Sequence, residues 1–536
     1  MTDVIVVGSG ASAVNAAYPL CEAGLKVAML DFGNRDDKYA PLVPSKDFLE
    51  VRRTEETQHR YFLGDRFEGV PMGDIRVGGT LTPPRQFVVA DAPELVPTDT
   101  GEFAPSESLA LGGLASGWGA GVLPLRDEDY ADMPITPADM EPHYKIVADR
   151  IGMSGGDDDL RPLFPDYGEL MPPLDLDSNA ESVLKRYERR RGAFNNEGFF
   201  MGRTPLAVLT RGHRGRGAHQ YHDMDYWADT DESVYRPGYT LKELKRFPNF
   251  SYLDNRLVLS FRETGDGAVE VTAALRDTKE IETRSARALV LSAGTLGSAR
   301  IVLRSLGKYG TRVPVLTNMY TFIPSINLNM FGKAPRDRRS SHAQVTLLYF
   351  RDSSGRHPVL SNFFSYRSLL TFKLLRESPL PHREGLAIMR SLLSLFAIVT
   401  VFHRDVPSAR KYCVLRESPG GGPDRMEIGY ETSEEEWRRY KADENAVKSF
   451  YRRLRCLPIK TIRLPPGSSV HYSGTLPMSR EKRELTCDSE GRLFGTRAVY
   501  VADGSVISPM PSTVPTLTMM AIADRVGALL ARRLGR

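Results

Sequence analysis

Cysteine is scarce in this sequence: its 536 residues include four, Cys21, Cys413, Cys456 and Cys487. None of them stands in a CxxC pair, so the sequence predicts neither a disulfide framework nor a cysteine metal site, and a reducing compartment fits best. The apolar run from Ser391 to Phe402 has 12 residues. A helix that spans a membrane needs about 20, so this run is too short to cross one.

An excess of charge of one sign is missing as well. The chain has 71 Lys and Arg residues against 67 Asp and Glu residues, a net charge of +4, and no block of basic residues. Nucleic acid is therefore not an expected partner. Only three residues precede the first apolar run, which leaves no room for a signal peptide. We expect a cytoplasmic protein, and its length predicts two large domains.

The first 31 residues carry a strand, turn, helix, strand pattern. Residues 4–7 and 27–30 are short apolar runs typical of buried strands. Residues 8–10, Gly-Ser-Gly, predict a tight turn, and 11–23 predict a helix. The pattern therefore predicts the start of a parallel α/β sheet.

The turn in this unit has the chemistry of a dinucleotide site. Gly8 can adopt a positive φ, and Gly10 has no Cβ, so a pyrophosphate can approach the start of the helix at Ala11 and Ser12. Asp31 follows the second strand, where a carboxylate can accept hydrogen bonds from a ribose. The unit predicts dinucleotide binding, and a buried strand-helix start without a ligand is the alternative.

A second glycine-rich stretch, LGGLASGWGAGVLPL, occupies residues 111–125. Gly112 and Gly113 predict a sharp turn, and Trp118 precedes an apolar exit. Small residues in series let a backbone lie against a flat ligand. A glycine-rich surface turn remains an equally open interpretation.

Later patterns divide the chain into two domains. Residues 288–291 predict a strand, 292–297 a turn of small residues, and a helix from Ser298, so the nucleotide domain is expected to be discontinuous. Strand-like runs between 307 and 484 predict a second domain built on a sheet. Residues 36–110 are turn-rich and predict loops and short strands.

Two segments suggest contacts outside the nucleotide site. Residues 365–396 have leucines at helical spacing among basic residues. With the run up to Phe402 they predict either a buried helix-to-strand passage or an amphipathic lid, a peripheral membrane contact through 365–402 that admits a lipophilic substrate. Residues 211–222, RGHRGRGAHQYH, predict a mobile basic loop facing an anionic substrate group. His219 and His222 lack a third ligand at recognisable spacing, so no metal is predicted.

The C-terminal part carries the most specific motifs. They are HYSGTLPMS at 471–479 and CDSEGRLFGTRAVYVADGSVISPMPSTVPTLTMMAIADRVGALLARRL at 487–534. With GSGASA near the N-terminus and SAGTLGSARIVL at 292–303, they resemble the glucose-methanol-choline (GMC) family of FAD-dependent alcohol oxidoreductases. The resemblance implies an α/β fold, with a discontinuous Rossmann-like FAD domain at 1–35, 75–150, 200–306 and 485–536. An α+β substrate domain on a large, mostly antiparallel sheet would cover 155–199 and 307–484, with a helical insertion near 365–396.

The resemblance also implies which residues bind FAD. They are Gly8, Gly10, Ala11, Ser12, Asp31, Gly113, Gly117, Trp118, Val258, Ala293, Gly294, Asp503, Gly504, Pro515, Thr516 and Leu517. Relatives that link flavin covalently do so through a histidine before the tryptophan. Here that residue is Gly117, so non-covalent FAD is expected.

His471 matches the family's active-site histidine, which would take the hydroxyl proton of an alcohol while hydride leaves its carbon. A second histidine or asparagine usually precedes the final Pro-Thr run, but here this place holds Val514, which has no polar side-chain atom. Either Ser512, Thr513 or Tyr472 supplies the contact, or the chemistry is redox-neutral, as in an isomerase or eliminase.

Residues 117–136 resemble a subgroup of the family that acts on sugars and glycosides. The expected substrate is therefore a sugar, a glycoside or a sugar-bearing lipophilic alcohol, oxidised by hydride transfer to flavin N5. The sequence leaves the electron acceptor open.

Overall fold

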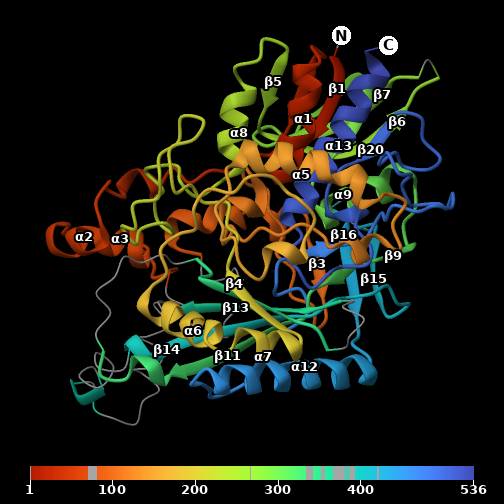
Figure 1. Cartoon of the computed structure of the whole chain (residues 1–536). Coiled ribbons are helices and arrows are strands. Elements are labelled where there is room, and N and C mark those ends of the chain that lie inside the picture. Colours follow the sequence, from red (N-terminus) through yellow and green to blue (C-terminus); the bar gives the residue numbers. More distant parts are fainter. Residues whose placement is uncertain are drawn as a thin grey trace.

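The computed structural model describes residues 2–69, 81–265, 267–333, 342–351, 357–365, 381, 383–385, 393–418 and 422–535. Two large sheets dominate it, one near the chain ends and one at the opposite end of the molecule (Figure 1). Helices cover both of them. The expected α/β fold with a second, sheet-based domain is thus present.

The first sheet contains the predicted dinucleotide unit. Its order is β5 (Phe250–Leu253), β2 (Val27–Leu30), β1 (Thr2–Val7), β8 (Ile281–Leu291), β7 (Val269–Leu275) and β6 (Arg256–Glu263), with β20 (Val499–Val501) also paired to β8. β1 runs parallel to both β2 and β8. Residues 4–7 are entirely buried, because both faces of a parallel sheet are covered by helices. Segments from the start, middle and end of the chain therefore share one sheet.

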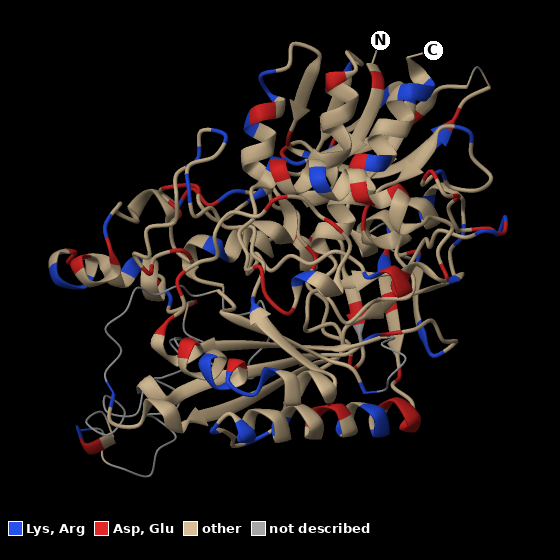
Figure 2. Ribbon diagram, in the orientation of Figure 1, with Lys and Arg blue, Asp and Glu red and all other residues tan. Residues whose placement is uncertain are grey.

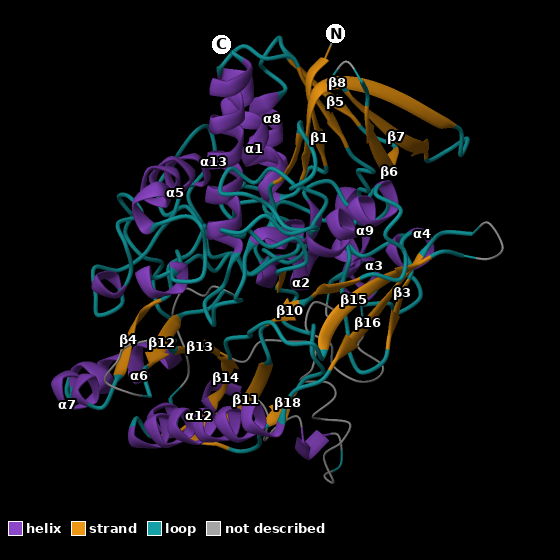
Figure 3. Cartoon of the chain, turned by 90° about the vertical axis from the view of Figure 1, so that its right-hand side faces the viewer, coloured by secondary structure: helices purple, strands orange, loops and turns teal. Residues whose placement is uncertain are grey.

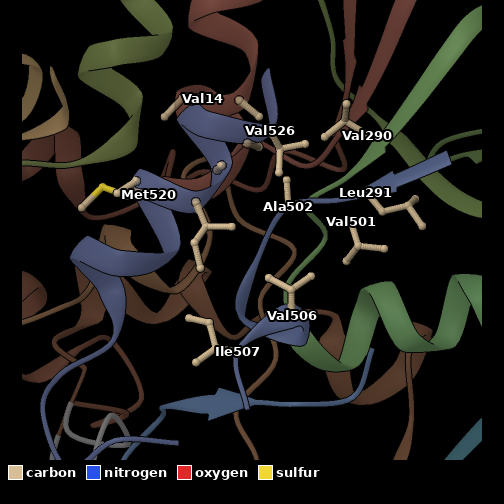
Figure 4. Packing of buried hydrophobic residues seen from close by; sticks show 14 of the residues in the cluster. Val14, Val290, Leu291, Val501, Ala502, Val506, Ile507, Met520 and Val526 are labelled. Carbon is tan, nitrogen blue, oxygen red and sulfur yellow. The ribbon is translucent and has the colours of Figure 1, made fainter. Parts of the chain in front are cut away.

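The first and last helices, α1 (Ala11–Glu22) and α13 (Thr516–Leu534), pack directly on one another. A Cβ at Gly527 of α13 would lie 2.2 Å from the carbonyl oxygen of Ala16, so only glycine permits this approach. Figure 4 shows Val14 and Val526 beside buried residues of β8 and β20. Both helices start at the carboxyl end of the sheet and run toward the chain ends (Figure 1).

Helix α5 (Pro137–Ile151) adds a buried ionic contact to this pair. Thr136 caps it, with Asp139 completing a capping box. The Arg150 guanidinium donates to Asp524 of α13 (2.8 Å) and to Asn15 of α1 (2.6 Å). The charge pair is 97% or more buried and fully hydrogen-bonded, which offsets much of its desolvation cost.

The second sheet has the order β17 (Cys456–Pro458), β11 (Tyr320–Asn327), β14 (Phe396–Phe402), β13 (Val359–Ser365), β12 (Val345–Tyr349) and β4 (Phe199–Arg203), with β18 (Ile462–Arg463) also on β11. All its pairings are antiparallel. One face packs on α12 (Glu434–Arg453), α6 (Ser178–Glu188) and α7 (Arg191–Asn196) through a separate apolar cluster. The other face joins the core of the first domain; Figure 3 shows the sheet between that domain and α12.

Helix α12 shows why this outer layer is helical. Ser433 and Glu436 form a capping box, acidic residues fill the first turn and Arg452 and Arg453 fill the last. These charges complement the helix dipole. Figure 2 shows acidic residues at one end of α12 and basic residues at the other.

Smaller elements connect the two domains. A third sheet joins β3 (Thr98–Thr100), β16 (Arg425–Tyr430), β15 (Lys411–Arg416) and β9 (Arg312–Pro314), and β10 (Leu316–Thr317) pairs with β19 (Tyr472–Ser473). The remaining α-helices of the described chain are α2 (Phe48–Thr54), α3 (Gln58–Leu63), α4 (Ala92–Leu95), α8 (Pro237–Leu244) and α9 (Thr295–Ser305). β3, from the predicted FAD domain, and β16, from the predicted substrate domain, therefore share a sheet.

Several expectations need correction. The boundary predicted at residue 200 falls inside β4. Residues 36–110 contain helices α2 and α3, the first capped by Asp47, rather than only loops and strands. Helix α9 begins at Thr295 instead of Ser298. Gly294 is its N-cap, and the Ser298 N–H already donates to the Gly294 carbonyl (2.8 Å).

The predicted mobile basic loop at 211–222 is also wrong. Arg214 pairs with Asp149 (3.1 Å) and Glu243 (3.0 Å), and His219 is 95% buried. The charge of Arg214 is therefore paired with carboxylates of this chain.

The helical insertion predicted near 365–396 lies largely outside the described residues. Of the segment proposed to contact a membrane, residues 396–402 form β14 and lie within the second sheet. Within the described chain, no helix combines the length and apolarity needed to cross a membrane.

Replacing Gly527 by alanine should lower the melting temperature by several degrees. Its methyl group would meet the Ala16 carbonyl, and such overpacking costs about 2 kcal/mol. Thermal unfolding followed by circular dichroism measures the effect. Gly192→Ala in α7 is the control, because its Cβ meets nothing within 4 Å and alanine favours helices. Equal melting temperatures for both variants would contradict the close contact.

Candidate active site

The turn between β1 and α1 has the geometry of a pyrophosphate site. Gly8 has φ +95°, and a Cβ there would lie 2.7 Å from the Ser292 carbonyl oxygen. Gly10 is the N-cap of α1, and no side chain caps this helix. Ala11 and Ser12 form its first turn, so their N–H groups remain available to an anion.

Asp31, at the end of β2, is buried beside this turn. Its Oδ2 accepts hydrogen bonds from Ser9 (2.5 Å) and Tyr252 (2.8 Å). Burial raises the pKa of the Asp31 carboxyl to about 6, against the effect of these two donors. Ser9 and Tyr252 hold the carboxylate in place at the end of β2. Ser9 stood between two predicted glycines, but nothing in the sequence indicated Tyr252.

The stretch around Gly112 meets the pyrophosphate turn. The Gly112 N–H donates to Ser9 Oγ (2.9 Å), and a Cβ at Gly113 would lie 3.4 Å from the Cα of Gly10. Both glycines have positive φ. The two glycine-rich segments therefore form one cradle, which favours the ligand-contact interpretation over a surface turn.

Gly117 and Trp118 end this stretch. A Cβ at Gly117 would lie 3.0 Å from Leu81 Cδ2, so this position is packed against the chain itself. The Trp118 indole donates to the Tyr235 carbonyl (2.7 Å), which fixes the ring, and its side chain remains half-buried.

The predicted positions in β6 and after β8 reach the same end of the sheet. Val258 follows Arg256, whose N–H donates to the Asp31 carbonyl (3.0 Å). Ala293 is half-buried and Gly294 exposed, and a Cβ at Gly294 would meet nothing within 4 Å. This turn has room for a nucleotide.

Asp503 and Gly504 contact protein groups. Asp503 accepts from Ser298 Oγ (2.6 Å) and the Ser505 N–H (2.9 Å), and burial raises the pKa of its carboxyl. A Cβ at Gly504 would lie 2.6 Å from the Tyr472 carbonyl oxygen. Both residues therefore fix the turn after β20 against α9.

Helix α13 points its N-terminus at the same region. Pro515 is its N-cap, and no side chain caps the helix at Thr516 and Leu517. The positive end of the helix dipole is thus free to stabilise negative charge.

His471 lies between the two sheets, just before β19. Its imidazole is half-buried and stacks on the Phe402 ring, with 5.7 Å between centroids and 28° between planes. The surrounding apolar groups disfavour the charged form and lower the pKa of His471 to about 4. The side chain is therefore neutral at physiological pH.

Asn318, which the sequence did not single out, determines the tautomer of His471. Its Nδ2 donates to the carbonyls of His403 (3.0 Å) and Pro511 (2.5 Å). Its Oδ1, 3.1 Å from His471 Nδ1, can therefore only accept. Nδ1 must carry the proton, which leaves the lone pair of Nε2 free to act as a base.

Two of the three candidates to replace the second polar group have other partners. Ser512 Oγ donates to the Pro358 carbonyl, and Tyr472 Oη accepts from the Ser106 N–H and donates to the Gly467 carbonyl. Thr513 Oγ1 is buried without a partner. Val514 is half-buried, with Cγ2 4.0 Å from a Cβ position at Gly121. Of the three hydroxyls, those of Ser512 and Tyr472 are already used, and that of Thr513 remains a candidate to replace the missing side chain.

Metal ligands do not gather anywhere in the described chain: no three His, Cys, Asp or Glu side chains are placed to hold an ion. His219 lies 3.2 Å from Ser233 Oγ, and His222 lies 3.4 Å from Asp231.

Known proteins are similar to this chain in sequence and in fold. Residues 423–523 match the family model described as GMC oxidoreductase. Paromamine 6'-oxidase of Streptomyces fradiae is 27% identical over 544 residues, which cover 99% of this chain and 91% of the relative. 6'''-Hydroxyparomomycin C oxidase of Streptomyces lividus is 24% identical over 565 residues, covering 99% and 92%.

Among solved structures, an FAD-dependent oxidoreductase from Chaetomium thermophilum superposes with a TM-score of 0.58 at 13% identity, covering 99% of both chains. The fold expected from the sequence is thus confirmed, and so is the resemblance to the GMC oxidoreductases. The chain carries the match to the GMC oxidoreductase model at 423–523, is similar over its whole length to oxidases, and is an FAD-dependent oxidoreductase acting on CH-OH donors.

Proposed function

We propose that this protein oxidises a CH-OH group of a sugar or glycoside, with His471 as the base. The observation that supports this role best is the hydrogen bond between His471 Nδ1 and Asn318 Oδ1. It leaves a neutral imidazole with an unprotonated Nε2 between the two domains. A substrate hydroxyl placed there loses its proton to Nε2 as its carbon gives up a hydride and becomes a carbonyl carbon.

The residues around the two glycine turns suit FAD. The uncapped start of α1 at Gly10 would hold the pyrophosphate, Asp31 the ribose, and the uncapped start of α13 at Thr516 the pyrimidine side of the ring. When bound, FAD supplies the hydride acceptor at N5. Gly117 offers no nucleophile for a covalent link, so we propose that FAD is held non-covalently.

Val514 supports a second candidate function. The hydroxyls of Ser512 and Tyr472 are used by other groups, and Thr513 is the one candidate of the three whose hydroxyl has no partner, so His471 lacks the usual second polar partner unless Thr513 supplies it. Loss of one such group costs about 3 kcal/mol of transition-state stabilisation when nothing replaces it. An isomerase or eliminase that uses one base is therefore the alternative.

The sugar assignment is supported by residues 117–136 and by relatives named as oxidases of paromamine and 6'''-hydroxyparomomycin C. A sugar-bearing lipophilic alcohol is part of the same proposal. We further propose a cytoplasmic location, with peripheral membrane contact through 365–402 as the variant for a lipophilic substrate.

Asp31→Asn should weaken FAD binding about 10-fold to 100-fold at pH 7.5, because a hydrogen bond to a charged acceptor contributes about 1.5–3 kcal/mol. Quenching of flavin fluorescence on titration of the apoprotein measures the dissociation constant. The raised pKa adds a pH signature: wild-type affinity should fall as pH drops below about 6 and Asp31 gains a proton, whereas the variant should not respond. Asp254→Asn, at an exposed pair with Arg35, is the control.

Anaerobic mixing of the yellow holoenzyme with alcohols tests the proposed function. Glucose, methyl β-D-glucopyranoside, paromamine, cholesterol and 1-decanol form the panel, and bleaching by a sugar is expected. His471→Ala should abolish bleaching while FAD stays bound, because no other group described at this position can take the proton. Turnover without net bleaching would favour the isomerase, and bleaching at the wild-type rate in His471→Ala would exclude His471 as the base.

Asn318→Leu should slow flavin reduction at least 10-fold, because Nδ1–H loses its acceptor and the wrong tautomer becomes populated. Asn318→Asp keeps an acceptor but adds a charge that favours the imidazolium, so its rate should begin to fall at a higher pH than that of the wild type. Stopped-flow reduction between pH 4 and 8 measures both. A wild-type pH profile in each variant would show that Asn318 does not orient the base.

A further inference from the structure

The second sheet presents two rows of side chains toward the FAD domain near His471. In the first row, Tyr320 of β11 stacks on Phe402 of β14 with 4.3 Å between ring centroids, and Phe402 stacks on His471. Leu360 of β13 lies opposite Phe402 in the sheet register. This row is apolar except for the Tyr320 hydroxyl, and it forms the support of the imidazole.

The second row lies two residues away from the first on strands β12, β13 and β14, and there it is polar. It comprises Thr400 of β14, Asn362 of β13 and Thr346 of β12. All three are at least 92% buried. Thr204 extends the row beyond β12, with its Oγ1 2.9 Å from Thr346 Oγ1. Four polar side chains side by side on a buried sheet face need a reason, because polar groups are costly to bury.

Hydrogen bonds within the row pair the threonine hydroxyls and fix the orientation of the Asn362 amide. Thr346 Oγ1 donates to Asn362 Oδ1 (2.7 Å), and the Asn362 N–H donates to Thr400 Oγ1 (3.2 Å). With Oδ1 turned to Thr346, Nδ2 points the other way. No residue of the described chain accepts a hydrogen bond from Nδ2, although Asn362 is only 8% exposed.

An amide donor in such a place costs about 1–3 kcal/mol if it stays unpaired. Its surroundings are specific, since Thr346 holds its orientation and the sheet fixes its backbone. These features are typical of an amide that donates a hydrogen bond to an oxygen atom of a bound ligand.

The sheet geometry gives the separation of Asn362 from Phe402, the ring that stacks on the imidazole of His471. Strands lie about 4.8 Å apart and rise about 3.4 Å per residue, so Asn362 and Phe402 are about 8 Å apart at Cα. Phe402 supports His471 directly. A pyranose whose reacting carbon lies at His471 Nε2 would therefore present another of its oxygens near Asn362.

We propose that Asn362 is a substrate-specificity residue, whose Nδ2 donates to an oxygen about one sugar ring away from the oxidised carbon. This inference rests on the proposed function and restricts it to polyhydroxylated substrates. Simple monoalcohols, which have no second oxygen at that distance, would gain nothing from Asn362.

Equilibrium binding to the dithionite-reduced holoenzyme under anaerobic conditions tests this without any turnover, because a reduced flavin accepts no hydride. Methyl β-D-glucopyranoside and its monodeoxy analogues are titrated while the flavin absorption spectrum is followed. In the wild type, one analogue should bind about 10-fold or more weakly than the parent, because it leaves Nδ2 unpaired. In Asn362→Leu the parent should lose the same factor, and removal of that hydroxyl should cost less than about twofold more.

Two further variants control the result. Asn196→Leu changes an exposed asparagine of α7 in the same domain and should bind as the wild type does. Thr346→Val keeps the amide but frees its orientation, and should weaken the parent by a smaller factor than Asn362→Leu. If Asn362→Leu fails to retain FAD, Thr346→Val replaces it as the test variant.

The outcomes separate this inference from the proposed function. If every analogue keeps its full penalty in both Asn362→Leu and Thr346→Val, or if the wild type binds no sugar of the series, Asn362 does not contact substrate and the inference is overturned. If the coupling is found but no sugar bleaches the flavin, Asn362 binds the sugar as proposed, and the oxidation fails instead.

Discussion

The contact of α13 with α1 at Gly527 is the constraint on which the cofactor region depends. Because Gly527 has no side chain, the last helix lies against the backbone of the first, and both begin at the carboxyl end of the same sheet. Their uncapped N-termini therefore point into one region, where both helix dipoles favour negative charge. The Arg150 bridge between Asp524 and Asn15 then fixes the rotation of the two helices.

A second buried charge network joins the segments next to His471 and before α13 to the third sheet and to helix α12. Lys411 is fully buried and donates to Asp405 and to Glu436, each at 2.5 Å. Asp405 also accepts from the Thr317 N–H (3.0 Å) and from Tyr430 Oη (2.7 Å), and its backbone pairs with Met510. Thr317 in turn pairs with Tyr472. The strand after His471 and the loop before α13 are thus held by the same carboxylate.

Local patterns predicted the regular elements well. The apolar runs at 4–7 and 27–30 are strands β1 and β2, and the helix predicted at 11–23 is α1. Such elements depend on hydrogen bonds and burial patterns within a few residues. The basic loop at 211–222 failed for the opposite reason. Whether Arg214 is solvated or paired depends on Asp149 and Glu243, which are distant in sequence.

The sequence by itself indicated the dinucleotide turn and the resemblance to GMC oxidoreductases and singled out His471 as a candidate, because a glycine turn and short motifs act through local backbone chemistry. Only the tertiary structure decided what the histidine can do. Asn318 lies between β10 and β11, and Asn362 lies in β13 of a sheet assembled over 260 residues of chain, from β4 to β17. Nothing near them in sequence indicates a function. The roles proposed for them follow from which atoms already have partners, and partners are a property of the folded chain.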